Sequence, residues 1–451
     1  MTAEWRQVPL GTLCEVITKG TTPTSLGFRF ATNGINFVKS ESVNFDGWID
    51  RSKFAQIDDD THRALKRSQL REGDLLFSMA GVYIGKTAVV PRDILPANTN
   101  QAVGIIRLRQ SVADPKFIDY HIRNRSYQSF IYGLISQSAQ PNLNLSEIRN
   151  LPINIPPLSE QKAIAAILGA LDDKIELNRR MNATLEAMAR ALFQSWFVDF
   201  DPVRAKLDGR APVGLDPAVA ELFPSTFRDS PVGTVPDGWP LMTLSEACTS
   251  GGGNIQTGPF GTQLHASDYV EAGVPCIMPT NLRDNRIDTS AIARITKHDA
   301  DRLRAYCVDA GDVVYSRRGD VERRSLIRDA EQGWLCGTGC LRVRFGKNGL
   351  NPYFGASYLG SPESRGWVVR HAVGATMPNL NTTILGGLPM IVPPTQLQKE
   401  FAALIKPWDE LGTVALKQSR TLGALRDTLL PKLLSGELNV KHLESQVAAV
   451  V

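Results

Sequence analysis

The chain contains an internal repeat whose two copies lie 237 residues apart, and this feature constrains the fold more than any other. Pro141-Asn142-Leu143-Asn144 returns as Pro378-Asn379-Leu380-Asn381. The same offset, without a gap, relates further pairs: Leu151-Pro152 and Leu388-Pro389, Pro156-Pro157 and Pro393-Pro394, Gln161-Lys162 and Gln398-Lys399, Asp172 and Asp409. A gap-free match of this length predicts two halves with one fold.

Weaker echoes extend the repeat toward the start of each half. Trp5 has a counterpart in Trp239, and the segment Gly73–Ser78 is echoed by Gly311–Ser316. A chain of 451 residues also exceeds what one hydrophobic core usually organises, and its 43% apolar residues can furnish two cores. We therefore expect two related domains.

Short apolar runs separated by turn residues predict strands in both halves. The clearest runs are Gly34–Lys39, Leu75–Ser78, Val103–Leu108, Val313–Ser316 and Leu341–Phe345. A helix is expected late in each half, near Pro115–Ile135 and Pro352–Arg370. The predicted fold class is α+β, with two mixed α/β domains in a pseudo-two-fold arrangement.

After each Pro-Pro pair the sequence predicts one long helix, from about Ser159 to Phe197 and from about Leu397 to Leu434. Apolar residues recur there at steps of three and four, which is typical of a coiled coil. They are Ile164, Ile167, Leu168, Leu171, Ile175, Met181, Leu185, Met188 and Leu192, then Phe401, Leu404, Ile405, Trp408, Leu411, Ala415, Leu422, Leu425 and Leu429. Asn178 and Gln418 interrupt these seams.

Two matching seams in one chain favour an antiparallel coiled coil of helices roughly 55 to 60 Å long, acting as a spacer between the domains. The alternative is that each helix packs only on its own domain. The expected plan is a first domain over 1–157, a helical region over 158–198, a linker over 199–238, a second domain over 239–394, a helical region over 395–438 and a tail over 439–451.

Charge and cysteine usage narrow the class of protein. The formal charge of +4 is mild for a lone DNA-binding protein, so either DNA is not the ligand or other subunits share the electrostatic work. The six cysteines form no CxxC pair, which favours buried reduced thiols over zinc or redox chemistry. No apolar stretch of about 20 residues and no signal-peptide layout are found, so we expect a cytoplasmic protein.

No motif supports catalysis by this chain. Met79–Thr87 looks like a phosphate-binding loop, but three residues instead of four separate Gly81 from Gly85. The histidines never pair at metal-ligand spacing, and no Ser/His/Asp arrangement stands out. We expect no metal, no cofactor and no catalytic residue in this chain.

Basic residues gather at one point of the second half. Five arginines and two acidic residues follow the strand Val313–Ser316: Arg317, Arg318, Arg323, Arg324, Arg328, Asp320 and Glu322. Arginines can bind guanine bidentately or pair with phosphate oxygens, although a solvated surface loop is an equal alternative. The matching loop of the first half carries different chemistry: Ser78, Met79, Tyr83 and Lys86.

Different chemistry at one repeated position suggests two different base sequences. Polar turns elsewhere are further candidates, with ordinary turn chemistry as the alternative. The candidate DNA-binding residues are Thr21, Thr22, Lys39, Ser40, Ser78, Tyr83, Lys86, Thr257, Asn281, Arg283, Arg317, Arg318, Arg323 and Arg324.

Three groups of sequence segments together resemble the specificity subunit of type I restriction-modification systems. They are the helix entries Pro156–Lys162 and Pro393–Lys399, the central segment Trp196–Lys206, and Pro141-Asn142-Leu143 with Asn100-Gln101-Ala102. The resemblance covers nearly the whole chain. It implies two target recognition domains, each reading half of a bipartite site on double-stranded DNA.

The resemblance also implies that the helical regions bind two methylation subunits and that restriction subunits join the complex. S-adenosylmethionine, ATP and Mg²⁺ would then belong to those partners. By the same resemblance, Gln161, Lys162, Gln398 and Lys399 are candidate contacts with partner subunits, with helix capping or packing as the alternative. Leu397 stands where the first copy has Glu160, which leaves equal use of the two copies open. Other hypotheses are an adaptor that has lost DNA binding and a self-contained enzyme.

Overall fold

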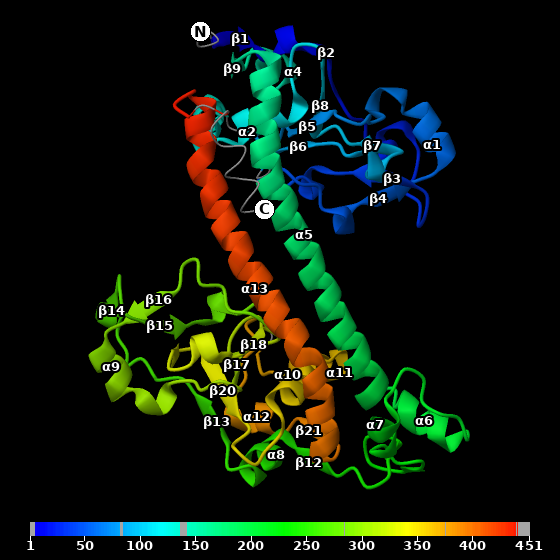
Figure 1. The fold of residues 1–451 in the computed structure, drawn as a ribbon, viewed down its shortest axis with the longest axis vertical. Coiled ribbons are helices and arrows are strands. Elements are labelled where there is room, and N and C mark those ends of the chain that lie inside the picture. The colour runs from blue at the N-terminus through cyan, green and yellow to red at the C-terminus, as the bar shows by residue number, and fades with distance from the viewer. Residues whose placement is uncertain are drawn as a thin grey trace. The chain divides into compact units, whose positions relative to one another are not determined.

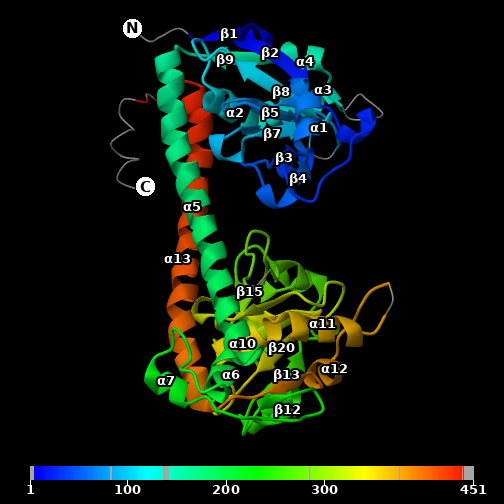
Figure 2. The ribbon, with the colours of Figure 1, turned by 90° about the vertical axis from the view of Figure 1, so that its right-hand side faces the viewer.

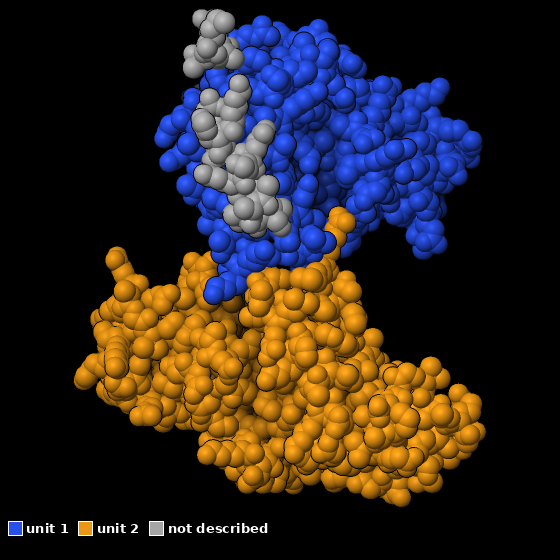
Figure 3. Space-filling view, viewed as in Figure 1, with its two compact units in different colours: residues 1–179, 416–451 blue, residues 180–415 orange. Residues whose placement is uncertain are grey.

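Each copy of the repeat builds a similar arrangement of strands and helices around its own core (Figure 1). The computed structural model describes residues 5–81, 84–135, 142–283, 285–374, 376–438 and 440. It divides into unit 1, residues 1–179 and 416–451, and unit 2, residues 180–415 (Figure 3). Tyr83 and, except for residue 440, the tail 439–451 lie outside the described residues.

Unit 1 contains two main sheets and a small strand pair. The four-stranded sheet has the order β2 (Cys14–Lys19), β8 (Val103–Leu108), β5 (Leu75–Ser78), β6 (Thr87–Val89). The three-stranded sheet has the order β4 (Ala55–Ile57), β3 (Ile35–Val38), β7 (Ala97–Thr99). β1 (Arg6–Pro9) pairs antiparallel with β9 (Pro152–Ile155). The helices of the domain are α1 (Asp59–Ala64), α2 (Pro115–Arg123), α3 (Arg125–Ile135) and α4 (Leu145–Arg149).

Unit 2 repeats this plan. Its first sheet has the order β13 (Asn254–Thr257), β20 (Cys340–Arg344), β17 (Val313–Ser316), β18 (Arg324–Leu326). Its second has the order β14 (Tyr269–Val270), β16 (Ala293–Ile295), β15 (Val274–Ile277), β19 (Leu335–Cys336). β12 (Leu241–Thr243) pairs with β21 (Pro389–Ile391). The helices are α8 (Leu244–Ser250), α9 (Lys297–Arg302), α10 (Pro352–Gly360), α11 (Pro362–His371) and α12 (Thr382–Gly386).

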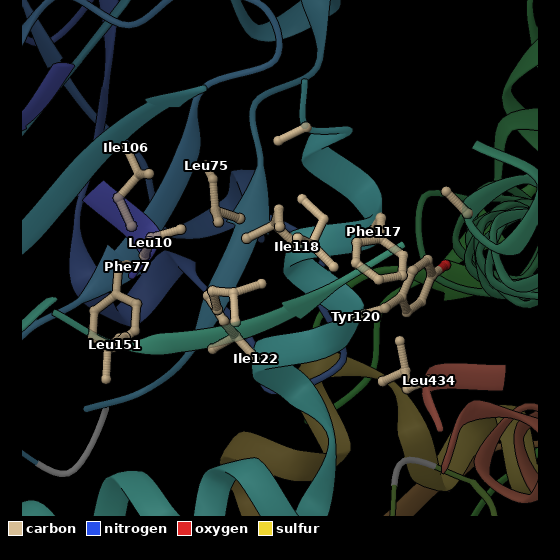
Figure 4. Packing of buried hydrophobic residues seen from close by; sticks show 14 of the residues in the cluster. Leu10, Leu75, Phe77, Ile106, Phe117, Ile118, Tyr120, Ile122, Leu151 and Leu434 are labelled. Atoms are coloured by element: carbon tan, nitrogen blue, oxygen red, sulfur yellow. The ribbon is translucent and has the colours of Figure 1, made fainter. Parts of the chain in front are cut away.

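Alternation along β5 explains why its sheet is buried on both faces. Leu75 and Phe77 point into the core that contains α2 and the start of α5, whereas Leu76 points into the core shared with β3 and β7 (Figure 4). In unit 2, Val313 and Tyr315 of β17 face one core and Val314 faces the other. Each of these strands is therefore buried along its whole length.

The Gly-Asp pairs that precede these strands hold the sheet together. Asp74 accepts two hydrogen bonds from Arg107 of β8, at 2.8 and 2.7 Å. Asp312 accepts the same pair of bonds from Arg344 of β20, at 2.8 and 2.6 Å. Both aspartates are buried, so each bidentate pair neutralises a carboxylate that would otherwise be costly to bury.

The long helices are α5 (Leu158–Phe197) and α13 (Thr395–Leu434), each of 40 residues. Within each unit the two helices lie side by side and antiparallel (Figures 1 and 2). In unit 1, Asp172 meets Arg426 and Asn178 meets Gln418, so residue numbers rise on one helix as they fall on the other. The predicted α+β fold with an antiparallel coiled coil is confirmed.

Part of the predicted seam was wrong. Met188, Leu404 and Leu411 are exposed, at 44, 45 and 47%. The inward-facing stripe of α13 in unit 2 instead follows Phe401, Ile405, Trp408, Gly412 and Ala415, at strict steps of four and three, with Trp408 partly buried and the other four buried. Leu404 and Leu411 each precede a stripe position by one residue, and a rotation of 100° places them on another face.

The helices predicted over 115–135 and 352–370 are each two helices. Asn124 separates α2 from α3, and its side chain accepts a hydrogen bond from the N–H of Ser126. Ser361 separates α10 from α11 and caps α11 at the N–H of Ser364. Because Pro362 follows, Ser361 is disfavoured in a helical conformation.

The segment 199–238, expected to be a linker, folds onto unit 2. It contains α6 (Asp201–Leu207), α7 (Pro217–Glu221) and the pair β10 (Phe227–Arg228) and β11 (Val235–Pro236). Phe200, Val203 and Phe223 are buried in the same core as Trp196 and Phe401. Its proline and glycine content predicted turns, but its aromatic residues make it part of the domain. Among the described residues, no helix is long and apolar enough to cross a bilayer.

Candidate nucleic-acid interface

In unit 1 the loops that carry candidate residues gather at one edge of the sheets. The N–H of Thr21, after β2, donates to Thr99 at the end of β7 at 3.0 Å. The Thr99 hydroxyl in turn donates to Val38 at the end of β3 at 2.7 Å. The N–H of Met79, after β5, donates to Ala102, before β8, at 2.8 Å. Strand ends therefore bring together the loop segments 20–31, 39–49, 79–81, 84–86 and 100–102.

Unit 2 assembles the same loops with different side chains. The N–H of Arg317 donates to Gly339 at 2.7 Å, and the N–H of Gly337 donates to Ile277 at 2.9 Å. The hydroxyl of Thr338 donates to the carbonyl of Pro259 at 3.0 Å. These bonds join the loop segments 258–268, 278–283, 285–287, 317–323 and 337–339.

The predicted arginines of the 317–324 hairpin are not equivalent. Arg318 is exposed, and Arg323 is partly exposed with its guanidinium 2.7 Å from Asp320. Arg317 is half-buried and donates through Nε to the carbonyl of Leu380. Arg324 is buried at 8% exposure and donates to Asn285, so it is not positioned for direct contact with DNA.

The corresponding side chains of unit 1 are more buried than the sequence suggested. Ser78 is fully buried, which argues against a base contact. Lys86 is 8% exposed, and its ammonium lies 4.5 Å from the centre of the Phe45 ring. Burial lowers the pKa of Lys86, with a smaller contribution from Lys53. Cation–π contact with Phe45 compensates part of that burial.

The candidate residues in the polar turns also divide into exposed and buried side chains. Lys39 and Arg283 keep 33 and 52% of their side chains exposed, whereas Ser40 and Asn281 are buried. Asn281 accepts from the N–H of Met278 and donates to Asp288, so it fastens its own turn. Thr21, Thr22 and Thr257 are half-buried. The side chains open to a ligand are therefore mostly lysine and arginine.

Asp172 of α5 centres an ion-pair network that sequence reasoning did not assign. It accepts from Tyr120 at 2.8 Å, from Arg123 at 3.0 Å and from Arg426 of α13 at 2.8 Å. Arg426 also lies 3.7 Å from Asp46, in the loop after β3. The network thus ties that loop to both long helices within unit 1.

The repeat equivalent, Asp409 of α13, fastens the corresponding loop of unit 2 to that helix. It pairs with Arg286 at 3.0 Å and with Arg328 at 2.6 Å. Arg286 also donates to Thr413 at 2.5 Å. The sequence signal for these two ion-pair networks was the recurrence of one aspartate at the repeat offset. The arginine partners, however, come from positions that do not repeat.

Each unit has a cleft beside this network. The cleft of unit 1 holds about 570 Å³ and is lined by Phe45, Lys86, Gln128 and Arg426 among others. The cleft of unit 2 holds about 590 Å³ and is lined by Arg286, Arg324, Trp408 and Asp409 among others. Because the linings differ, the two clefts present different surfaces at one repeated position.

The candidate partner contacts at the helix starts divide into two kinds. Lys162 and Lys399 are exposed. Gln161 and Gln398 are 1 and 2% exposed, and their side chains hydrogen bond to their own domains. The glutamines are therefore packing residues, and the lysines remain candidate contacts.

Comparison with known proteins agrees with this architecture. Residues 2–187 match the family model described as the type I restriction modification DNA specificity domain. The MjaIX specificity subunit of Methanocaldococcus jannaschii is 23% identical over 387 residues, covering 85% of this chain and 82% of its own length. The MjaVIII subunit of the same organism is 21% identical over 450 residues, covering 98% and 94%.

A shorter relative and a solved structure complete the comparison. The HindI specificity subunit of Haemophilus influenzae is 34% identical over 143 residues, 31% of each chain. The crystal structure of the type I restriction-modification S subunit from M. genitalium has a TM-score of 0.57 at 16% identity and covers 96% of each chain, which shows a shared fold. Residues 2–187 therefore carry the DNA specificity domain of type I restriction modification, and along 85 to 98% of its length the chain is similar to the specificity subunits of these systems.

Proposed function

We propose that this chain reads a bipartite site on double-stranded DNA, with one half recognised by the loops of each unit. The observation that carries the proposal is the repeated loop cluster with unlike exposed side chains. Unit 1 presents Lys39 there, whereas unit 2 presents Arg283, Arg318 and Arg323. One scaffold with two sets of base-reading groups suits a target whose halves differ in sequence.

The unread spacer between the half-sites would be set by the long helices. α5 and α13 each continue without a break from one unit into the other. A matched insertion of seven residues in each helix adds about 10 Å and nearly preserves the helix face. We expect the spacer to lengthen by about three base pairs, and an unchanged spacer in the methylated motif would contradict this role.

The helices would also dock two methylation subunits, with restriction subunits joining the complex. Leu404, Leu411 and Val414 of α13 are 45, 47 and 64% exposed and lie outside the inward-facing stripe. An exposed apolar row of this kind suits a partner helix. Lys399, exposed at the start of α13 near this row, would flank that contact, and the exposed Lys162 at the start of α5 is a further candidate contact.

Catalysis would reside in the partners. S-adenosylmethionine would be bound by the methylation subunits, and ATP with Mg²⁺ by the restriction subunits. The isolated chain is expected to transfer no methyl group and to cleave no DNA. Methyl transfer by the purified chain alone would contradict this division of labour.

An exchange of one domain tests the proposal. Residues 1–150 are replaced by the equivalent segment of another family member, and the complex is expressed in a host without methylation of its own. Sequencing of methylated bases is expected to show one altered half-site and one unaltered half-site. A motif that does not change, or a complex that methylates without sequence preference, would reject the proposal in favour of an adaptor.

A further inference from the structure

Phe260 is an exposed aromatic residue in a unit whose other phenylalanines are covered. It lies in the loop after β13 and is 56% exposed. Among the described residues of unit 2 it is the one phenylalanine that reaches this exposure. An aromatic ring left in water at a loop tip forgoes the stabilisation that burial would give, so a ligand that covered it would gain that stabilisation.

The loop holds Phe260 in a fixed position. Its N–H donates to the Gln263 side chain at 3.2 Å, and its carbonyl accepts from the N–H of Gln263 at 2.8 Å. Gln263 is itself fastened to the second sheet's flank, since its side chain accepts from Tyr306 at 3.1 Å and its carbonyl accepts from Arg302 at 3.0 Å. A ring presented on such a braced turn loses little entropy on binding.

The loops beside Phe260 indicate what kind of ligand would cover it. Pro259 accepts from Thr338, and the loop of Thr338 accepts in turn from Arg317 at the start of the arginine hairpin. The exposed Arg318 and the partly exposed Arg323 belong to that hairpin. An exposed ring whose loop is hydrogen-bonded, through the loop of Thr338, to the arginine hairpin suits a polyanion with flat apolar bases better than an apolar protein surface.

We propose that Phe260 is an apolar wedge that enters a base step in the half-site read by unit 2. This inference rests on the proposed function and adds a contact to it. Apolar side chains between base pairs unstack a step and make recognition depend on the deformability of the sequence there. Phe260 would thereby contribute specificity that hydrogen bonds from the hairpin do not supply.

The test uses the complex assembled with its methylation subunits. The methylated motif is first determined by sequencing, and the half-site of unit 2 is assigned by the domain exchange. Duplexes carrying one 2-aminopurine are then scanned through that half-site. With the wild-type chain, fluorescence is expected to rise at one step, because the base analogue brightens when it is unstacked.

Three variants make the result specific. Phe260→Ala is expected to remove the fluorescence rise and to weaken specific binding by about ten-fold or more. Phe260→Leu keeps an apolar wedge and is expected to retain both the fluorescence rise and the specific binding. Val213→Ala removes another exposed apolar side chain of unit 2, 94% exposed, and is expected to change neither. Circular dichroism melting confirms that each variant folds.

The possible outcomes distinguish a failure of the Phe260 wedge from a failure of the proposed bipartite reading. If Phe260→Ala binds and unstacks like the wild type, the wedge is rejected and the bipartite reading stands. If the wild type shows no unstacking although Phe260→Ala binds weakly, the ring contacts stacked bases and the wedge is also rejected. If the wild type binds its own methylated motif no better than random duplex, the proposed function itself fails.

Discussion

The side-chain oxygen of Gln161 accepts a hydrogen bond of 2.9 Å from the main-chain N–H of Asp114, the residue that caps α2. Gln398 makes the same bond, also of 2.9 Å, to the N–H of Asn351, which caps α10. The Gln161 amide also donates to the carbonyls of Val112 and Pro156. The glutamine of the repeated Gln-Lys pair therefore anchors each long helix to its own domain.

Gln161→Ala is expected to destabilise unit 1 by about 1–3 kcal/mol, because buried backbone groups around the side chain lose their partner. The free energy of unfolding from urea titration is the measurement. Lys162→Ala is the matched control and should change stability by less than about 0.5 kcal/mol, since Lys162 is exposed. Unchanged stability of Gln161→Ala together with lost partner binding would restore the contact role.

The coiled coil contains a polar pair that should couple energetically. Asn178 donates to Gln418 at 2.9 Å and is 3% exposed. Asn178→Leu alone is expected to cost about 1–2 kcal/mol, and Asn178→Leu with Gln418→Leu should recover that loss. A double-mutant cycle measures the coupling, and strictly additive effects would show that the pair does not act as a unit.

His121 should make unit 1 sensitive to acid. It is 7% exposed between Phe117 and Tyr127, and burial lowers its pKa from 6.5 to about 4. Between these values the unfolded chain binds a proton that the folded chain does not, so stability falls as pH falls from about 6.5 to about 4. The contribution is on the order of 3 kcal/mol.

His121→Phe removes the titrating group and keeps an aromatic ring. Its free energy of unfolding is expected to depend less on pH over this window than that of the wild type. Equal slopes of stability against pH for the two proteins would show that His121 does not carry the effect.

Substitutions of Arg318 and Arg324 should distinguish a residue that contacts DNA from a residue that stabilises the fold. Arg318→Ala removes an exposed cation and is expected to weaken DNA binding by the assembled complex by about 1–3 kcal/mol if the contact is to a base. Fluorescence anisotropy at several salt concentrations distinguishes this from a phosphate contact, which would lower the salt slope by about one.

Arg324→Ala serves as the comparison. Its buried guanidinium donates to Asn285 in the loop that bears Arg286, so the variant is expected to lower the melting temperature instead. An Arg324→Ala chain with wild-type stability and impaired specific binding would return Arg324 to the interface.

The sequence predicted those features that depend on local periodicity and on repetition. The strands Leu75–Ser78 and Val313–Ser316 have the bounds that their apolar runs indicated, and the long helices start within two residues of the predicted positions. Candidate site residues were harder to choose. Ser78 ends a predicted strand and Asn281 lies in a polar turn, and tertiary packing buries both side chains.

The sequence by itself determined the duplication and the paired helices, because an offset of 237 residues and a heptad step are properties of residue order alone. Tertiary structure decided which polar groups are available to DNA or to a partner. Gln161 is buried while Lys162 is exposed, and Arg324 is buried while Arg318 is exposed. Such differences arise because burial depends on contacts between residues far apart in the chain, which neither composition nor spacing encodes.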